Sequence, residues 1–145
     1  LHALFDEIHR QRVRCEHLVL KASMVISGKE CAQQAGAQQV ADATVQCLKR
    51  TVPAAVPGIV FLSGGQSDEF ATAHLNAMNA GGAGLPWPLS FSYGRALQAP
   101  ALKAWKGQPV NVPAAQKALF HRSKCNSAAT FGRYQPAMEK EALMA

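Results

Sequence analysis

One arrangement occurs three times along this chain: a short apolar stretch, then a loop that contains glycine, then a helical pattern. The apolar stretches cover residues 18–26, 58–62 and 89–93. Stretches this short and this uniformly apolar are typical of strands that are buried on both faces of a parallel sheet. Because consecutive parallel strands are joined by a crossover, usually a helix, the order predicts an α/β protein with right-handed crossovers.

The spacing of apolar residues predicts five helices around these strands. The third helix has a clear start signal, because Ser67 can cap it and Asp68 and Glu69 follow in its first turn. Negative charge is favourable there, since the helix dipole is positive at its amino-terminal end. Pro53 and Pro57 stop the helix before it,. The predicted helices cover residues 1–8, 40–48, 68–78, 96–105 and 113–130.

Three parallel strands alone would leave two apolar edges unpaired, which soluble proteins avoid. The 145 residues, 48% of them apolar, are enough for one domain with a buried core,. A (β/α)8 barrel, however, takes about 250 residues. We therefore expect residues 1–145 to form the last third of such a TIM barrel, without an internal domain boundary, and to be a piece of a longer protein.

The net charge of +6 indicates which partners the chain attracts. Basic residues are scattered along the sequence rather than gathered on one helix with interleaved aromatic residues. This distribution favours phosphorylated metabolites over nucleic acid. We also expect no membrane span, because the most apolar stretch, 18–26, is much shorter than the roughly 20 residues that a span needs,.

The cysteines and histidines lack the spacing of a metal site, since there is no C-x-x-C pair and no histidine at zinc-finger distance from a cysteine,. We expect no metal, cysteines that are reduced thiols in a cytosolic protein, and histidines that are structural or solvated. These residues are Cys15, Cys31, Cys47 and Cys125, and His2, His9, His17, His74 and His121.

Lys21 interrupts the first apolar stretch. An ammonium group in a buried strand must be paired, reach solvent or lose its proton. Burial lowers the pKa of a lysine, and a neutral amine is a nucleophile for carbonyl groups. The residue is therefore a candidate catalytic amine, and the alternative is a lysine whose stem is buried and whose head reaches a carboxylate.

Two loops that follow consecutive strands have the composition of a phosphate site. Ser63, Gly64 and Gly65 lie between the second strand and the start of a helix, and Gly94 and Arg95 follow the third strand. Glycine lets backbone N–H groups approach an anion, and arginine offers a planar pair of donors. Taken singly, the first loop is equally a tight turn with positive φ and the second a surface arginine; together they favour phosphate.

The longest motifs resemble one known family, the class I fructose-bisphosphate aldolases. The resemblance lies in residues 51–67, 75–79, 91–98 and 101–105, and it includes the L-S-G-G-Q-S and S-Y-G-R-A-L-Q runs. Upstream, Glu16 and the residues around Lys21 are similar to the Schiff-base strand of the family. Downstream, residues 132–134 and Pro136 are similar to its closing segment.

The resemblance implies an enzyme that cleaves fructose 1,6-bisphosphate reversibly into dihydroxyacetone phosphate and glyceraldehyde 3-phosphate in glycolysis and gluconeogenesis. It implies strands 6 to 8 of the barrel, a homotetramer, a cytoplasmic location, and no cofactor or metal. Lys21 would be the Schiff-base lysine on the sixth strand. The loop residues of the seventh and eighth strands would bind the sugar phosphate: Ser63, Gly64, Gly65, Ser92, Gly94 and Arg95.

Some residues depart from the family pattern. His17 replaces a usual glycine, Ala22 and Ser23 replace Pro-Asn, and no tyrosine follows Tyr134. The acid-base carboxylates of the family precede the Schiff-base strand, and residues 1–20 do not supply them. We therefore expect the chain alone to be inactive. The alternatives are a non-catalytic phosphosugar-binding remnant or truncated module, and a different Schiff-base barrel that acts on another sugar phosphate.

Overall fold

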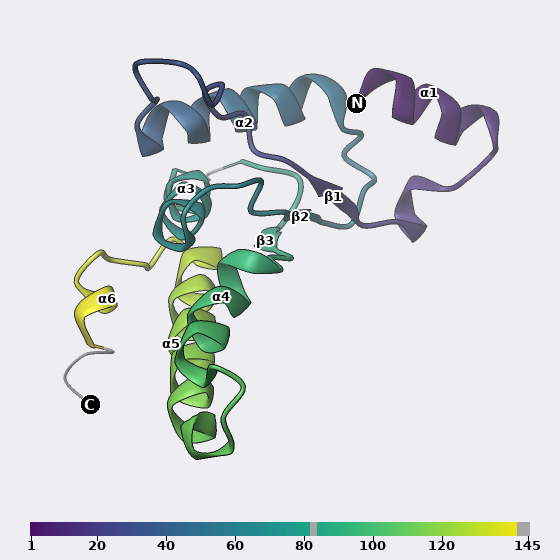
Figure 1. Ribbon diagram of the computed structural model, residues 1–145. Helices are drawn as coiled ribbons and strands as arrows, with labels where there is room; N and C mark the ends of the chain where they lie inside the picture. Colours follow the sequence, from purple (N-terminus) through teal and green to yellow (C-terminus); the bar gives the residue numbers. More distant parts are fainter. Residues whose placement is uncertain (82–83, 142–145) are drawn as a thin grey trace.

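Three short strands form one parallel sheet in the order β1-β2-β3 (Figure 1). The computed structural model describes residues 1–81 and 84–141. The strands are β1 (Leu20–Ala22), β2 (Ile59–Phe61) and β3 (Leu89–Phe91). Leu20 is in register with Ile59, and Ile59 with Leu89. The α/β class and the parallel order predicted from the sequence are thus confirmed.

The five predicted helices are all present, with bounds close to those predicted. The Ser67 hydroxyl accepts a hydrogen bond from the backbone N–H of Phe70 at 3.1 Å, which confirms the predicted cap. Two single-turn 3₁₀ helices and one short helix near the end were not predicted from the sequence. The helical elements are α1 (His2–Arg10), η1 (Cys15–His17), α2 (Ala37–Thr51), α3 (Asp68–Ala80), α4 (Arg95–Trp105), η2 (Pro109–Asn111), α5 (Val112–Thr130) and α6 (Met138–Glu141).

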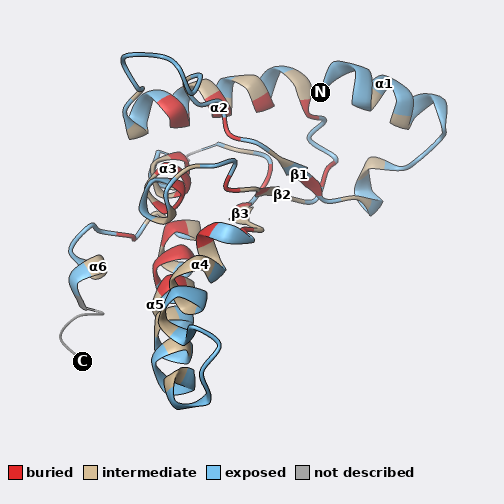
Figure 2. Ribbon diagram, in the orientation of Figure 1, coloured by how far each residue is buried: buried red, intermediate tan, exposed pale blue. Residues whose placement is uncertain are grey.

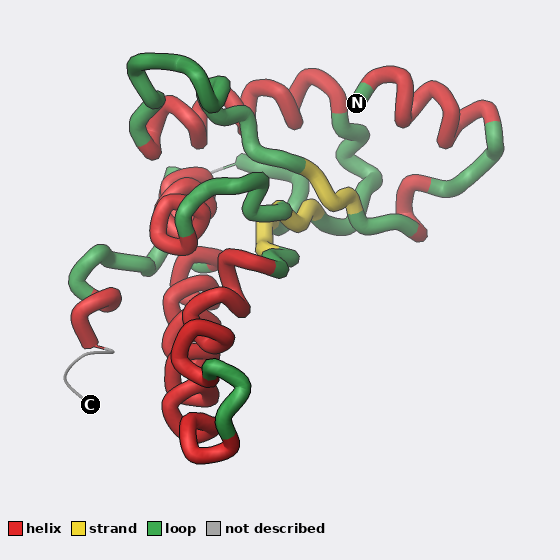
Figure 3. The backbone as a smooth tube through the Cα atoms, viewed as in Figure 1, coloured by secondary structure: helices red, strands yellow, loops and turns green. Residues whose placement is uncertain are grey.

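Helices cover one face of the sheet. Leu20, Ile59 and Leu89 lie on that face, and they are buried in one core with residues of α2, α3 and α5. Figure 2 shows that buried residues concentrate where these helices meet the sheet, whereas α1 contains none. Figure 3 shows α4 leading away from the sheet and α5 returning beside it, with a loop and η2 at the far end.

The other face of the sheet is uncovered, and here the prediction of strands buried on both faces is wrong for this chain. Lys21 is in register with Val60, and Val60 with Ser90, so these three residues share that face. Lys21 is exposed. The predicted stretch 18–26 also forms only a three-residue strand, and Val19 is 60% exposed. The physical reason is that β1 pairs on one side only and no described helix packs over Lys21.

Two other expectations concern the chain as a whole. No helix within residues 1–81 and 84–141 is long and apolar enough to cross a membrane. Cys15, Cys31 and Cys47 carry free thiols, as predicted.

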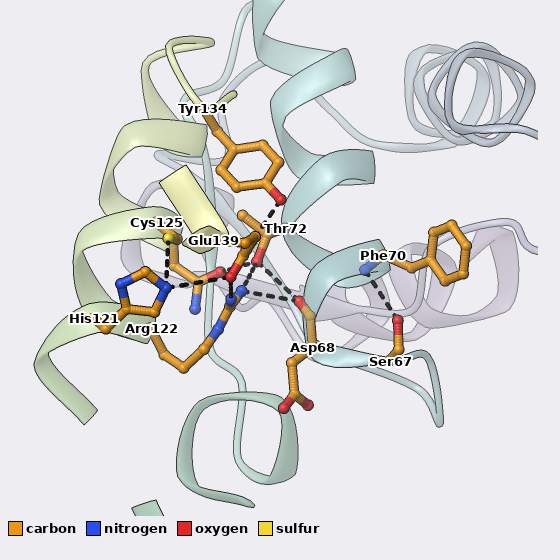
Figure 4. A network of polar contacts seen from close by, with 10 residues as sticks. Ser67, Asp68, Phe70, Thr72, His121, Arg122, Cys125, Tyr134 and Glu139 are labelled. Atoms are coloured by element: carbon orange, nitrogen blue, oxygen red, sulfur yellow. Dashed lines mark hydrogen bonds and ion pairs between the residues drawn. The ribbon is translucent and has the colours of Figure 1, made fainter. Parts of the chain in front are cut away.

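A buried ion pair attaches α6 to α5 and α3 (Figure 4). The guanidinium of Arg122, on α5, donates from Nη1 to Glu139 Oε2 at 2.5 Å and from Nη2 to the Thr72 hydroxyl at 2.6 Å. Glu139 also accepts a hydrogen bond from the Tyr134 hydroxyl at 3.0 Å, and its Oε2 lies 3.3 Å from His121 Nε2. The Glu139 carboxylate therefore connects α6 to α5, while the backbone N–H of Tyr134 donates to Asn76 Oδ1 on α3 at 2.8 Å.

Opposing effects act on this carboxylate. Burial alone would raise the pKa of Glu139, but the hydrogen bond and charge of Arg122, with the hydrogen bonds of Tyr134 and His121, hold that pKa below its ordinary value of 4.5. The charged form is therefore favoured in the folded state. Its contribution to stability is complete above the unfolded-state pKa and is lost as pH falls through the lower folded-state pKa.

The Glu139→Gln variant should be less stable than the wild type at pH 7, by about 1–3 kcal/mol, because a charged hydrogen-bond partner is lost from a mostly buried site. Between about pH 5 and pH 3 the wild type should lose more stability than the variant, since the variant has no carboxylate to protonate there. Urea unfolding of wild type and variant at pH 7, at about pH 5 and at about pH 3, in the natural polypeptide that contains this chain, measures the difference. Parallel pH profiles for the two proteins would contradict the assignment.

Gly132 lies where the end of α5 meets the end of α3. Its φ is +66°, and a Cβ atom there would lie 2.8 Å from both the N and the Cα of Ala80. Because the neighbouring atoms are backbone, they cannot move aside as a flexible side chain could. The position therefore requires glycine for its conformation and for its space.

Gly132→Ala should lower the free energy of unfolding by more than about 2 kcal/mol, since strain and a backbone clash add. The matched control is Gly84→Ala, where φ is +93° but an added Cβ meets no atom within 4 Å. That control should lose about 1 kcal/mol, from strain alone. Urea unfolding of both variants tests this, and equal losses would show that the approach to Ala80 is unimportant.

Candidate functional site at the ends of the strands

All the predicted site residues lie on a strand or just beyond its carboxyl end. Lys21 is the middle residue of β1, Ser63 and the two glycines follow β2, and Ser92 follows β3. Because the three strands are parallel neighbours, their carboxyl ends form one edge of the sheet. The loops after β2 and β3 are in direct contact at this edge.

Arg95 makes that contact. It is the first residue of α4, and its Nη2 donates a hydrogen bond to the backbone carbonyl of Gln66. Its Nη1 lies 3.5 Å from Asp68 Oδ1. The Arg95 side chain is 50% exposed, so this ion pair is screened by water and contributes little to stability,. The guanidinium is thus held against the glycine loop while part of it faces solvent.

The loop after β2 has the backbone of a tight turn. Gly64 and Gly65 have φ of +59° and +85°. A Cβ on Gly64 would lie 3.3 Å from Leu62 Cδ1. The turn that the sequence analysis considered as an alternative is therefore present. It leads directly into the capped start of α3, and it is compatible with an anion at that place.

Gln66, which was not among the predicted site residues, connects the segments that follow all three strands. Its Nε2 donates to the Ser63 carbonyl at 2.9 Å and lies 3.6 Å from Met24 Sδ, beyond β1. The backbone carbonyl of Gln66 accepts a hydrogen bond from the Arg95 guanidinium. The only sequence signal for this role was its place in the L-S-G-G-Q-S run, since its partners lie in three separate segments.

The Gln66 side chain also determines the state of His74. Because Gln66 Nε2 faces the Ser63 carbonyl, Oε1 is the atom that faces His74 Nδ1, at 2.5 Å. The carbonyl oxygen accepts, so Nδ1 carries the proton of the neutral ring. Burial lowers the pKa of His74, which favours this neutral form. The prediction of a structural histidine fits this geometry.

Lys21 is placed differently from what the sequence predicted. It is exposed, and among the described residues it has no hydrogen-bond or ion-pair partner. Within residues 1–81 and 84–141, neither predicted environment is present: the amine is not buried, and no carboxylate pairs with it. The amine does lie on the sheet face that no described helix covers, beside Val60.

The remaining predicted residues form the framework of the second loop. The backbone N–H of Ser92 donates to the Phe61 carbonyl at 2.8 Å, which continues the pairing of β2 and β3. Gly94 caps α4, and its carbonyl accepts from the N–H groups of Leu97 and Gln98. The helix thus begins at Arg95, one residue earlier than predicted. Ser63, in the first loop, is buried.

A cavity of about 450 Å³ lies beside this edge, between residues 26–35 and α3. Gly64, Gly65 and Gln66 line it, together with Phe70 and His74. Lys21 and Arg95 do not line it. Gln66, which lines the cavity, is also the residue whose backbone carbonyl accepts a hydrogen bond from Arg95.

One group of side chains has the composition of a metal site. His121, Cys125 and Glu139 each place a ligand atom within 4.8 Å of the others. However, the Arg122 guanidinium lies 2.5 Å from Glu139 Oε2, and its positive charge opposes a second cation there,. The cluster is better described as part of the ion-pair network that holds α6.

Comparisons with known proteins agree with the motifs. A family model for class-I fructose-bisphosphate aldolase matches residues 1–145. The chain is 55% identical over 136 residues to a probable fructose-bisphosphate aldolase class 1 of Xanthomonas axonopodis pv. citri, and 56% identical over 131 residues to fructose-bisphosphate aldolase 2 of Caenorhabditis elegans. A solved structure of Plasmodium falciparum fructose-bisphosphate aldolase, in complex with TRAP and a small-molecule inhibitor, matches with a TM-score of 0.89 at 47% identity.

The alignments cover most of this chain but less than half of its relatives. They include 93% of the chain and 40% of the Xanthomonas protein, 90% of the chain and 36% of the Caenorhabditis protein, and 92% of the chain and 38% of the Plasmodium protein. Since the family model extends over all 145 residues, the chain belongs to the family of class I fructose-bisphosphate aldolases.

Proposed function

We propose that the natural polypeptide containing this chain cleaves fructose 1,6-bisphosphate reversibly into dihydroxyacetone phosphate and glyceraldehyde 3-phosphate. The observation that carries the proposal is that, in a chain of this family, a lysine and an arginine-bound glycine loop belong to neighbouring parallel strands. Lys21 lies on β1, and the Arg95 guanidinium is held against the glycine loop after β2. An amine and a phosphate-binding edge are the two parts that an imine-forming enzyme for sugar phosphates requires.

The chemistry assigned to Lys21 is covalent catalysis. The neutral amine attacks the ketose carbonyl, and loss of water gives a protonated imine. The hydroxyl group on the β carbon loses its proton to a base, the bond between the α and β carbons of the imine breaks, and the β carbon leaves as the aldehyde. The bonding electrons move toward the iminium nitrogen, which gives an enamine. Protonation of the enamine and addition of water then release the ketone and restore the amine. The protonated imine is the electron sink, so this route requires no cofactor.

The two loops would hold the phosphate of the ketose end. The Arg95 guanidinium has five N–H donors, and the Gln66 carbonyl and Asp68 account for part of them,. Backbone N–H groups of the glycine loop would supply further donors near the start of α3. The residues proposed to bind the substrate are Ser63, Gly64, Gly65, Ser92, Gly94 and Arg95.

The strands β1, β2 and β3 would be strands 6, 7 and 8 of a TIM barrel. In such a barrel the helices cover the outer face and alternate strand residues fill the interior. The uncovered face with Lys21, Val60 and Ser90 would then point inward, and the other strands would enclose it. We further propose a cytoplasmic glycolytic enzyme that is a homotetramer, as in the family resemblance.

One observation favours a second role for the 145 residues by themselves. Lys21 is exposed, and no carboxylate among the described residues pairs with it. Without an acid-base partner the chain alone would bind a sugar phosphate at its loops and not turn it over. A phosphosugar-binding module is therefore the second candidate.

Borohydride reduction in the presence of dihydroxyacetone phosphate should attach the ketone covalently to the Lys21 peptide of the natural polypeptide, because reduction traps the imine. Lys21→Met should abolish both the labelling and the turnover of fructose 1,6-bisphosphate. Lys117→Met, a change of another exposed lysine that lies on α5, is the control and should retain both. Mass spectrometry of the digest identifies the labelled residue. Labelling of the Lys21→Met variant would refute the role of Lys21, and phosphate binding without labelling of the wild type would favour the binding module.

Arg95→Ala should raise the KM for phosphorylated ketoses by about 10- to 100-fold, because a hydrogen-bonded charge pair with the phosphate is lost. Turnover of saturating substrate should change less. The matched control is Arg133→Ala, since Arg133 is also exposed and its guanidinium lies over the Phe131 ring instead of a loop of the site. Steady-state kinetics of both variants test this, and an unchanged KM for Arg95→Ala would remove it from the binding site.

A further inference from the structure

Arg122 is the most deeply buried cation in the described part of the chain, and the proposed chemistry does not use it. It is 3% exposed and lies on α5, away from the strand ends. Its Nε has no hydrogen-bond partner among the described residues. Replacing a buried ion pair by apolar residues is often neutral or stabilising, so stability alone does not account for a buried arginine with an unpaired donor.

The contacts of Arg122 converge on the first turn of α3. Nη2 donates to the Thr72 hydroxyl at 2.6 Å and to the backbone carbonyl of Asp68 at 3.2 Å. The Thr72 hydroxyl in turn lies 2.9 Å from the same carbonyl. Nη1 is held by Glu139 at 2.5 Å, which neutralises the charge. The guanidinium thus fixes the position of Asp68 from the interior.

Arg95 holds the same residue from the outside. Its Nη1 lies 3.5 Å from Asp68 Oδ1, while Arg122 contacts the Asp68 carbonyl. Figure 4 shows the Asp68 carboxylate directed away from Arg122, with its carbonyl turned toward it. Both arginines therefore contact Asp68, Arg122 through the backbone carbonyl and Arg95 through the side chain.

A second contact connects this turn to the loop after β3. The hydroxyl of Tyr93, two residues before Arg95, donates to the Ala71 carbonyl on α3 at 2.7 Å. If the first turns of α3 moved, the position of Tyr93 would therefore change, and so would the position of Asp68, which pairs with the Arg95 side chain. The Arg95 guanidinium has no other ion-pair partner among the described residues.

We propose that Arg122 is a positioning residue for Arg95, acting through the first turn of α3, with Glu139 as its counter-ion. Arg122 does not contact the substrate; it sets where Asp68 holds the phosphate-binding guanidinium. The inference rests on the proposed function, because it assumes that Arg95 binds the phosphate.

The test is a double-mutant cycle on phosphate affinity in the natural polypeptide, with inorganic phosphate as the probe and a competitive inhibitor of cleavage. Arg122→Met should weaken inhibition by phosphate by about ten-fold and raise the KM by a similar factor. In an Arg95→Ala background the same change should have almost no effect, since the group on which it acts is gone. Arg133→Met is the matched control and should be neutral in both backgrounds.

If Arg122→Met fails to fold, Thr72→Val takes its place in the double-mutant cycle. This variant keeps the arginine and removes one hydrogen-bond acceptor of its guanidinium. Its effect on phosphate affinity should be smaller, about three-fold, and should also vanish with Arg95→Ala. A purely structural role would lower kcat and the melting temperature while the KM stays unchanged, and that result would overturn the inference.

The two proposals fail in different ways. If Arg122→Met weakens phosphate binding equally with and without Arg95, the positioning role is wrong and the proposed function stands. If Arg95→Ala leaves phosphate affinity unchanged, the assignment of Arg95 in the proposed function is wrong, and the positioning role falls with it.

Discussion

Parallel pairing of three neighbouring strands is the constraint on which the site depends. Since β1, β2 and β3 run in one direction, every loop that leaves a carboxyl end emerges at the same edge. Met24 and Ser63 lie in two such loops, Arg95 begins the helix after the third, and all of them contact Gln66. An antiparallel arrangement would place alternate loops at opposite edges and separate these residues. The geometry proposed for phosphate binding is therefore a direct consequence of strand direction.

The two faces of the sheet have different roles because only one is covered. Leu20 and Ile59 pack into the helical layer and supply the free energy of burial,. Lys21 and Val60 lie on the opposite face, where a polar amine remains accessible. Alternation along a strand thus places an exposed amine and a core residue next to each other in the sequence, and on opposite sides of the sheet.

Two ion pairs, Arg95–Asp68 and Arg122–Glu139, lie near the start of α3, and the contact of Arg122 with the Asp68 carbonyl connects them. Arg95 pairs with Asp68 near solvent, where water weakens the interaction, and the buried Arg122 pairs with Glu139, whose side chain is 17% exposed,. The inner pair is therefore less screened by water than the outer pair. It connects α3, α5 and the segment that contains Tyr134, while the Arg95 side chain of the outer pair remains half exposed.

The sequence by itself determined the features that depend on neighbouring residues: the three strands, the five helices, the Ser67 cap and the glycine turn at Gly64. These follow from periodicity, capping and φ preference, which act within a few residues. The two loops were predicted to act together because consecutive strands place them side by side. Only the tertiary structure decided that Lys21 is exposed, since burial depends on what covers a face. It also decided that Arg122 meets Glu139, 17 residues away, and that Gln66 joins three loops. Contacts of this kind depend on how helices pack, and no local pattern encodes them.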